Sequence, residues 1–190
     1  WYFGVVLRSQ GGGVSDAAPF AWCDVEKEVD PSQVFPKPTA MLSSGKGTHL
    51  YWKFDRIEAP DRAVRVATLA ALALGGDFAV CEPNRVMRLP GSKNMKYDPP
   101  KNCTVLNYSP VKYPVDNLEE GFLAMAVSRL WGEGAIEHRH AASMAVAALL
   151  VRAGWAQARA ERVIRAMCRI TQDGAEADRL QAVAGTYRRV

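Results

Sequence analysis

A change of pattern near residue 117 constrains the fold of this chain more than any other feature. Before it, short apolar runs alternate with turns rich in glycine and proline, which is typical of strands. After it, alanine, leucine and arginine predominate and lysine disappears. This later pattern predicts a bundle of helices at 118–130, 138–153, 156–170 and 175–187, separated in part by single glycines. We therefore expect an α+β domain at 1–116 and a small all-α helical bundle at 117–190.

Within 1–116 the pattern indicates a sheet with packed helices. Residues 1–7 are typical of a strand already under way without an initiator methionine, so an N-terminally truncated piece of a larger protein is expected. A glycine-rich connection at 11–13 follows, and Arg8 beside it is a candidate contact to a template. A proline at its start and two glycines at its end predict a helix at 61–74, and 105–108 is expected to close the sheet.

Two acids, Asp24 and Glu26, stand two residues apart in the alternating run 20–26. In an extended strand such residues share a face, so both carboxylates are expected side by side. Hard divalent cations prefer carboxylate oxygens, which makes the pair a candidate metal site. Alone, the spacing is more typical of the solvated face of a strand than of a metal site.

The segment 43–49 joins two apolar runs through a turn that carries Ser44, Lys46, Gly47 and His49. Glycine lets backbone N–H groups approach phosphate oxygens, while lysine and histidine add donors and positive charge. A hairpin turn without any ligand explains the same residues, because serine and glycine are common in turns.

Farther along, Asp77 is followed by a basic segment at 85–94, expected as a strand, which carries Arg85, Arg88 and Lys93. Arginine can grip a phosphate with two N–H groups, and lysine supplies a point charge. Ion pairing on a solvated strand is the alternative for the same residues. The order of acids, phosphate-type turn, third acid and basic segment matches the needs of a nucleoside triphosphate with two divalent ions.

These motifs resemble those of the archaeo-eukaryotic primase (AEP) superfamily, and in particular the primase-polymerases (PrimPols) of plasmids, phages and related mobile elements. That family carries an acid-x-acid pair on a strand, a small-x-His element and a final acid on a neighbouring strand. In this sequence the motifs read Asp24-Val25-Glu26, Gly47-Thr48-His49 and Asp77. The fuller strings Ser-Gly-Lys-Gly-Thr-His-Leu-Tyr-Trp and Arg-Val-Met-Arg-Leu-Pro-Gly-Ser-Lys-Asn look like the mobile-element versions.

The resemblance implies an RRM-like mixed sheet with packed helices, followed by the helical module of such primases. It implies a DNA primase or polymerase that transfers a nucleotidyl group to a 3′ hydroxyl or an initiating nucleotide on single-stranded DNA. Catalytic roles would fall to three metal-holding acids and a histidine, namely Asp24, Glu26, Asp77 and His49. Triphosphate contacts would come from Ser44, Lys46, Gly47, His49, Arg85, Arg88 and Lys93. Glu82 stays open as an alternative to Asp77.

The implied cofactor is Mg²⁺ or Mn²⁺, and no structural zinc is expected, because the cysteines at 23, 81, 103 and 168 form no Cys-x-x-Cys pair. The implied partners are a single-stranded template with its primer, nucleoside triphosphates and a helicase region of the same parent protein. The net charge of +4 agrees with nucleic acid without requiring it. No apolar run reaches the roughly 20 residues that span a bilayer, so we expect no membrane contact and a cytoplasmic protein.

Two other functions stay open at this point. A replication-initiation or single-stranded DNA-binding module could keep the fold without the chemistry. A rolling-circle nicking protein needs a tyrosine nucleophile and normally two histidines separated by one apolar residue. Here the corresponding pair, His138 and His140, flanks Arg139 at the start of an expected helix, which makes this alternative the weaker one.

Overall fold

The structure is a computed structural model that describes residues 2–6, 17–132 and 138–189. The chain packs as two compact units, Trp1–Glu119 and Glu120–Val190. The first contains the strands and the second is helical, so the expected α+β class is confirmed. The glycine-rich connection at 11–13 and Arg8 lie outside the described residues.

The main sheet of the first unit has four strands in the order β2 (Ala18–Val25), β4 (Thr48–Glu58), β3 (Ala40–Ser43) and β8 (Thr104–Tyr108). Its neighbouring strands pair antiparallel, and β3 and β4 form a hairpin. A parallel pairing is described at the isolated bridge between Phe54 and Tyr113. The closing strand expected at 105–108 is confirmed as β8. Between β2 and β3, Pro31–Gln33 forms a short 3₁₀ helix, η1.

Two short ladders complete the strands, β1 (Tyr2–Gly4) with β5 (Val86–Arg88) and β6 (Lys93–Asn94) with β7 (Lys101–Asn102). The basic segment expected as one strand is therefore two strands. A turn interrupts it, in which the N–H of Ser92 donates to the carbonyl of Leu89 and Gly91 takes a φ of 82°. Only a residue without Cβ adopts that conformation easily, so the glycine is what separates β5 from β6.

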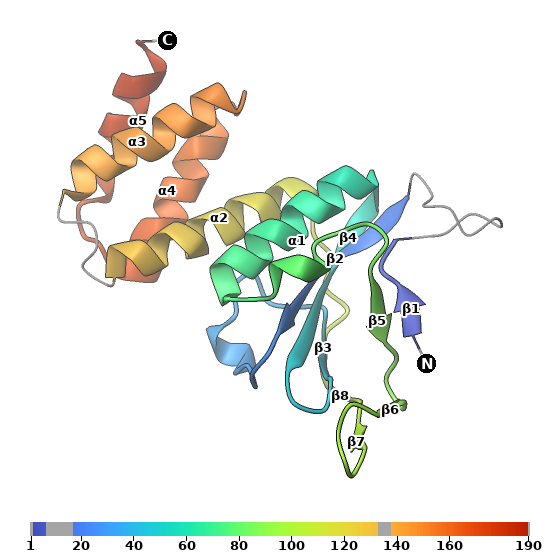
Figure 1. The fold of residues 1–190 in the computed structure, drawn as a ribbon. Coiled ribbons are helices and arrows are strands. Elements are labelled where there is room, and N and C mark those ends of the chain that lie inside the picture. The colour runs from blue at the N-terminus through green and yellow to red at the C-terminus, as the bar shows by residue number, and fades with distance from the viewer. Residues whose placement is uncertain (1, 7–16, 133–137, 190) are drawn as a thin grey trace. The chain divides into compact units, whose positions relative to one another are not determined.

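Helix α1 (Pro60–Leu74) covers the back of the sheet and packs against β2 (Figure 1). The side chains that it buries are almost all alanine, so helix and strand can approach closely. The helix ends at Gly75 in the left-handed conformation, as the sequence predicts. On β2 the residues facing this side, Ala21, Cys23 and Val25, are fully or almost fully buried, and the alternate residues, which include Asp24, lie on the opposite face of the sheet.

The helical unit consists of α2 (Val115–Gly132), α3 (Arg139–Arg152), α4 (Gln157–Thr171) and α5 (Glu176–Tyr187), and the four expected helices are confirmed. The first residues of α2 belong to the first unit. The core of the helical unit includes Trp131, Ile164 and Met167. No helix among the described residues is both long enough and apolar enough to cross a membrane.

Candidate nucleotide and metal site

On the face of the main sheet opposite α1, an acid lies beside a histidine. Asp24 of β2 pairs in register with His49 of β4, and the Nε2 atom of His49 lies 3.7 Å from Oδ2 of Asp24. Glu26 was expected on the same strand, but β2 ends at Val25, so Glu26 is an exposed residue in the bend that follows. The expectation of one continuous strand through both acids is therefore wrong by one residue.

His49 is almost completely buried, with 2% of its surface exposed. Burial, followed by the positive charges of Arg88 and Arg85, lowers its pKa to about 4. The imidazole is therefore neutral near pH 7, and one ring nitrogen donates while the other accepts. The hydroxyl of Tyr51 lies 3.4 Å from Nδ1 of His49 and helps to fix the ring from the neighbouring position of the same strand face.

Asp77 does not lie on a strand, which corrects the expectation from the family motif. It precedes the 3₁₀ helix η2 (Phe78–Val80), and its Oδ1 accepts a hydrogen bond of 2.8 Å from the N–H of Ala79. Its own N–H donates to the backbone carbonyl of Asp24 at 2.8 Å. The residue is thus held beside the acid strand by its backbone, although it is not part of the sheet.

The carboxyl of Asp24 has a raised pKa because of burial first, and then because of the negative charges of Asp77 and Glu26. The guanidinium groups of Arg85 and Arg88 oppose this shift. A bound cation would reduce the repulsion between these acids, and a bound anion would pair with the neighbouring arginines. The site is therefore suited to a ligand that brings both charges. Glu82, the alternative third acid, is exposed, and no effect of Glu82 on Asp24 is resolved.

Asp24 and Glu26 both line a polar pocket of about 180 Å³. It brings together six of the residues expected at the site, which are Asp24, Glu26, Ser44, Lys46, Gly47 and Arg88. The other expected residues, His49, Asp77, Arg85 and Lys93, do not line it. The site therefore combines the end of β2, the β3–β4 turn and the end of β5.

Three further residues that were not among the expected site residues also line the pocket, namely Asn94, Lys96 and Tyr97. Asn94 is buried, and its amide donates to the carbonyl of Ser44 at 2.7 Å. Its Oδ1 accepts from the N–H of Lys96, so one side chain fastens two walls of the pocket. Asn94 ends the basic motif and had that signal, whereas nothing in the sequence marked Lys96 or Tyr97.

Arg85 and Arg88 each have a buried Nε atom without a hydrogen-bond partner among the described residues. A buried, unpaired donor costs free energy, and an arginine donor usually finds an oxygen. Both arginines are close enough to Asp24 and His49 to shift the pKa of each. They are therefore placed to receive an anionic ligand beside the acids.

Gly47 closes the turn above the acids. The N–H of Ser44 donates to the carbonyl of Gly47 at 2.9 Å, and the N–H of Gly47 donates to the hydroxyl of Ser44 at 3.2 Å. A Cβ on Gly47 would lie 2.3 Å from the carbonyl oxygen of Val25. Only glycine lets the turn lie this close to the end of β2. The Ser44 hydroxyl is thus already used in the turn.

The chemistry of these donors fits a hard divalent cation, because Asp24 and Glu26 are both carboxylates that face one pocket. Among the described residues, however, no group of three histidine, cysteine or acidic side chains is arranged to hold a metal ion. The side chain of Asp77 caps η2 through one oxygen.

The two histidines relevant to a nicking protein lie elsewhere, at the start of α3 in the helical unit. The Nδ1 atom of His140 lies 2.9 Å from Oδ2 of Asp178, so this ring has a carboxylate partner of its own.

Comparisons with known proteins add the fold family. No protein-family model and no curated protein matches the sequence. Among solved structures, the AEP domain of the cyanophage S-2L primase-polymerase is similar with a TM-score of 0.53 and 19% identity, over 64% of this chain and 69% of that one. The primase RepB′ is similar with a TM-score of 0.48 and 13% identity, over 88% and 71% of the two chains. Its catalytic domain, solved with initiator DNA, gives a TM-score of 0.47 and 15% identity over 63% and 64%. Over the 64% of the chain that aligns with the cyanophage AEP domain, the fold is therefore that of this AEP domain.

Proposed function

We propose that this protein is a template-directed DNA primase-polymerase. It transfers a nucleotidyl group from a nucleoside triphosphate to a 3′ hydroxyl, or to an initiating nucleotide, on single-stranded DNA. The observation that carries this proposal is the polar pocket, which is lined by Asp24 and Glu26 together with Lys46 and Arg88. Acids and cations in one pocket match a metal-bound triphosphate.

Asp24 and Glu26 would hold Mg²⁺ or Mn²⁺, and Asp77, which precedes η2 beside the acid strand, is the proposed third acid. When bound, such ions lower the pKa of an attacking hydroxyl and neutralise charge on the leaving pyrophosphate. The raised pKa of Asp24, caused by burial and by its acidic neighbours, supports this assignment, because a cation would offset the repulsion. Asp77 is preferred to Glu82 because its N–H is bonded to the backbone of Asp24.

The remaining residues bind and orient the triphosphate. Arg85 and Arg88 supply the unpaired Nε donors, and Lys46 and Lys93 add positive charge. For His49, which is neutral near pH 7, the proposed contact is a hydrogen bond donated to a phosphate oxygen and not a charge interaction. Preorganised donors of this kind stabilise charge that develops during the transfer.

The catalytic domain is assigned to 1–116 and the helical bundle to 117–190. A single-stranded template with its primer and nucleoside triphosphates are the proposed ligands, and a helicase region of a longer parent protein is the proposed partner. Contact with the strand backbone is expected to weaken with salt and to be independent of sequence.

The test is incorporation of labelled nucleotide on a primed and an unprimed single-stranded template, with Mg²⁺ or Mn²⁺ and after chelation by EDTA. Asp24→Asn and Glu26→Gln keep the shape of each side chain and remove its charge. Glu28→Gln is the matched control, because Glu28 is an exposed acid two residues from Glu26 that does not line the pocket. Asp77→Asn compared with Glu82→Gln identifies the third acid.

We expect metal-dependent incorporation that falls by at least about 100-fold in Asp24→Asn and Glu26→Gln and is unchanged in Glu28→Gln. Salt-sensitive strand binding without incorporation by the native chain would refute the proposal and favour a DNA-binding module without catalysis. Incorporation that survives in Asp24→Asn would place the chemistry elsewhere. Cleavage of the template with a covalent tyrosine adduct would indicate a nickase instead.

A further inference from the structure

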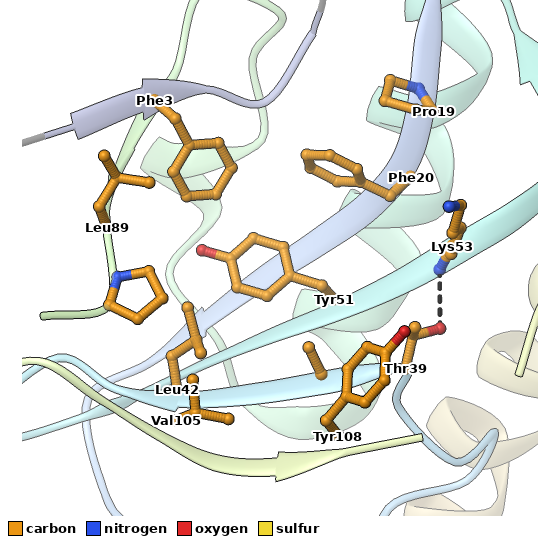
Figure 2. Close-up of a pocket in the computed structure, with 12 residues that line it drawn as sticks. Phe3, Pro19, Phe20, Thr39, Leu42, Tyr51, Lys53, Leu89, Val105 and Tyr108 are labelled. Atoms are coloured by element: carbon orange, nitrogen blue, oxygen red, sulfur yellow. Dashed lines mark hydrogen bonds between the residues drawn. The ribbon is translucent and has the colours of Figure 1, made fainter. Parts of the chain in front are cut away.

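A second cavity opens on the same face of the main sheet, beside the polar pocket. It has a volume of about 560 Å³ and an almost entirely apolar lining. Figure 2 shows Phe3, Phe20 and Tyr51 pointing toward one another from β1, β2 and β4. Their ring centroids are 5.7 to 6.1 Å apart. The opposite wall comes from β3 and β8 and includes Tyr108 (Figure 2).

Residues that contact or pair with His49 link the apolar cavity to the polar pocket, although His49 itself lines neither. Tyr51 lines the cavity and its hydroxyl lies 3.4 Å from Nδ1 of His49. Leu42 lines the cavity and is the register partner of His49, and Ser44, two residues later, lines the polar pocket. A ligand whose reacting end lies at Asp24 therefore has the cavity directly beside it.

The lining has the chemistry of a nucleobase site. Tyr108 is 69% exposed and Val105 is 55% exposed, so this wall is accessible to a ligand and is not part of the core. Bases stack on aromatic rings whatever their identity, because every base has a π face. A cavity with so few polar side chains offers little with which to distinguish one base from another.

Lys53 defines the other end of the cavity. It follows His49 by four residues on β4, a separation of about 13 Å along the strand. Its side chain is exposed, and no acid of the described residues forms an ion pair with it. A cation at this end complements a phosphate. The cavity thus lies between two phosphate-type positions, the arginines at one end and Lys53 at the other.

This arrangement favours a nucleic-acid strand over a free nucleotide. A nucleoside triphosphate with its phosphates at the arginines would place only its 3′ hydroxyl near Lys53. The 3′-terminal nucleoside of a strand, with its 3′ hydroxyl toward Asp24, places its 5′ phosphate there. We propose that the apolar cavity binds the 3′-terminal nucleoside of the strand being extended, with its base on Tyr108 and Phe20, its 5′ phosphate at Lys53 and its 3′ hydroxyl toward Asp24. This inference rests on the proposed function and adds a site for the acceptor strand to it.

The test uses oligonucleotides with the fluorescent base 2-aminopurine either at the 3′ end or at an internal position, bound to the full 190-residue chain. Stacking on aromatic rings quenches this base. Tyr108→Ala and Lys53→Gln change exposed residues and should leave the fold intact. Phe35→Ala and Lys37→Gln are the matched controls, because both residues are exposed and neither lines the cavity.

We expect quenching at the 3′ end and not at the internal position. Tyr108→Ala should remove the quenching and weaken strand binding by about 5- to 150-fold, whereas Phe35→Ala should change neither. Lys53→Gln should weaken binding and reduce its salt dependence relative to Lys37→Gln. Equal quenching in Tyr108→Ala and Phe35→Ala would overturn the inference.

A third arm uses 2-aminopurine nucleoside triphosphate without any strand. Quenching of this nucleotide that is lost in Tyr108→Ala would overturn the choice of a strand, because the cavity would then hold the incoming base. Asp24→Asn separates the two proposals, since it should abolish incorporation and retain 3′-end quenching. If the native chain quenches the 3′-terminal base and yet incorporates no nucleotide, the proposed polymerase function is refuted, whereas the proposed binding of the 3′-terminal nucleoside in the cavity is not.

Discussion

Replacing Gly47 by alanine tests how tightly the β3–β4 turn is fitted to the acid strand. The added Cβ would lie 2.3 Å from the carbonyl oxygen of Val25 and 3.1 Å from Cα of Glu26. Both contacts are to backbone, so no side chain can rotate away. Moving the closer contact from 2.3 Å to an ordinary 3.4 Å requires a separation of about 1.1 Å between turn and strand.

That separation affects both stability and the position of the acids. The pairing of Val25 with Thr48 would be stretched, and overpacking of this kind costs about 1–3 kcal/mol in the free energy of unfolding. A displacement of about 1 Å at a reacting centre can reduce the rate about 100-fold. We therefore expect Gly47→Ala to be less stable and at least 100-fold slower in nucleotide incorporation.

Urea unfolding followed by tryptophan fluorescence measures the first effect, because Trp22 and Trp52 are fully buried in the first unit. Gly185→Ala is the control, since a Cβ there meets nothing within 4 Å and alanine favours a helix by up to about 1 kcal/mol. If Gly47→Ala has the same midpoint of urea unfolding as the native protein and the same rate of nucleotide incorporation, the turn can move away from β2 without loss, and the prediction is wrong.

Three further predictions concern charge. Glu120 accepts hydrogen bonds from Arg159 and Arg162. Glu120→Gln should therefore lower the free energy of unfolding, measured by thermal melts, by about 1–3 kcal/mol. The control Glu161→Gln, at a more exposed ion pair, should lower it by less than about 0.5 kcal/mol. Burial raises the pKa of Asp173, but hydrogen bonds from the Ala175 N–H and from Arg179 lower it by more, so its pKa lies below the ordinary value for aspartate. Its ionised form therefore stabilises the fold above the ordinary pKa of about 3.9, and the stability difference between the native protein and Asp173→Asn should shrink as the pH falls below that value; a constant difference would contradict the assignment. His49, with a pKa of about 4, should show NMR ring signals of the neutral form from pH 8 to pH 5, assigned by their absence in His49→Gln, and its titration near 6.5 would refute the burial argument.

The elements with strong local signals were predictable from the sequence. Helix α1 has a proline at its start and glycines at its end, and the β3–β4 turn has its glycines, so both follow from residues within a few positions. The end of β2 at Val25 did not follow, since Glu26 continues the alternating pattern without a partner to pair with.

The parts of the site that depend on distant contacts were not predictable. Asp77 lies beside the acid strand because its N–H donates to the carbonyl of Asp24, a contact between residues 53 positions apart that no local pattern encodes. Lys96 and Tyr97 reach the polar pocket because Asn94 is fastened to Ser44, 50 residues earlier. The apolar cavity joins β1, β2, β3, β4 and β8, so its existence depends on the whole topology.

The alanine-rich face of α1 makes the back of the sheet a place from which activity can be adjusted. Ala71 lies at the point where the helix meets the acid strand, since its carbonyl accepts from the N–H of Gly76 and a Cβ on Gly76 would lie 2.5 Å from Sγ of Cys23. Larger side chains along this face would push β2 away from α1 and displace the acid that it carries by an amount that grows with side-chain size. Natural or laboratory variants with graded or temperature-sensitive activity are therefore expected at these alanines, although none of them lines the polar pocket.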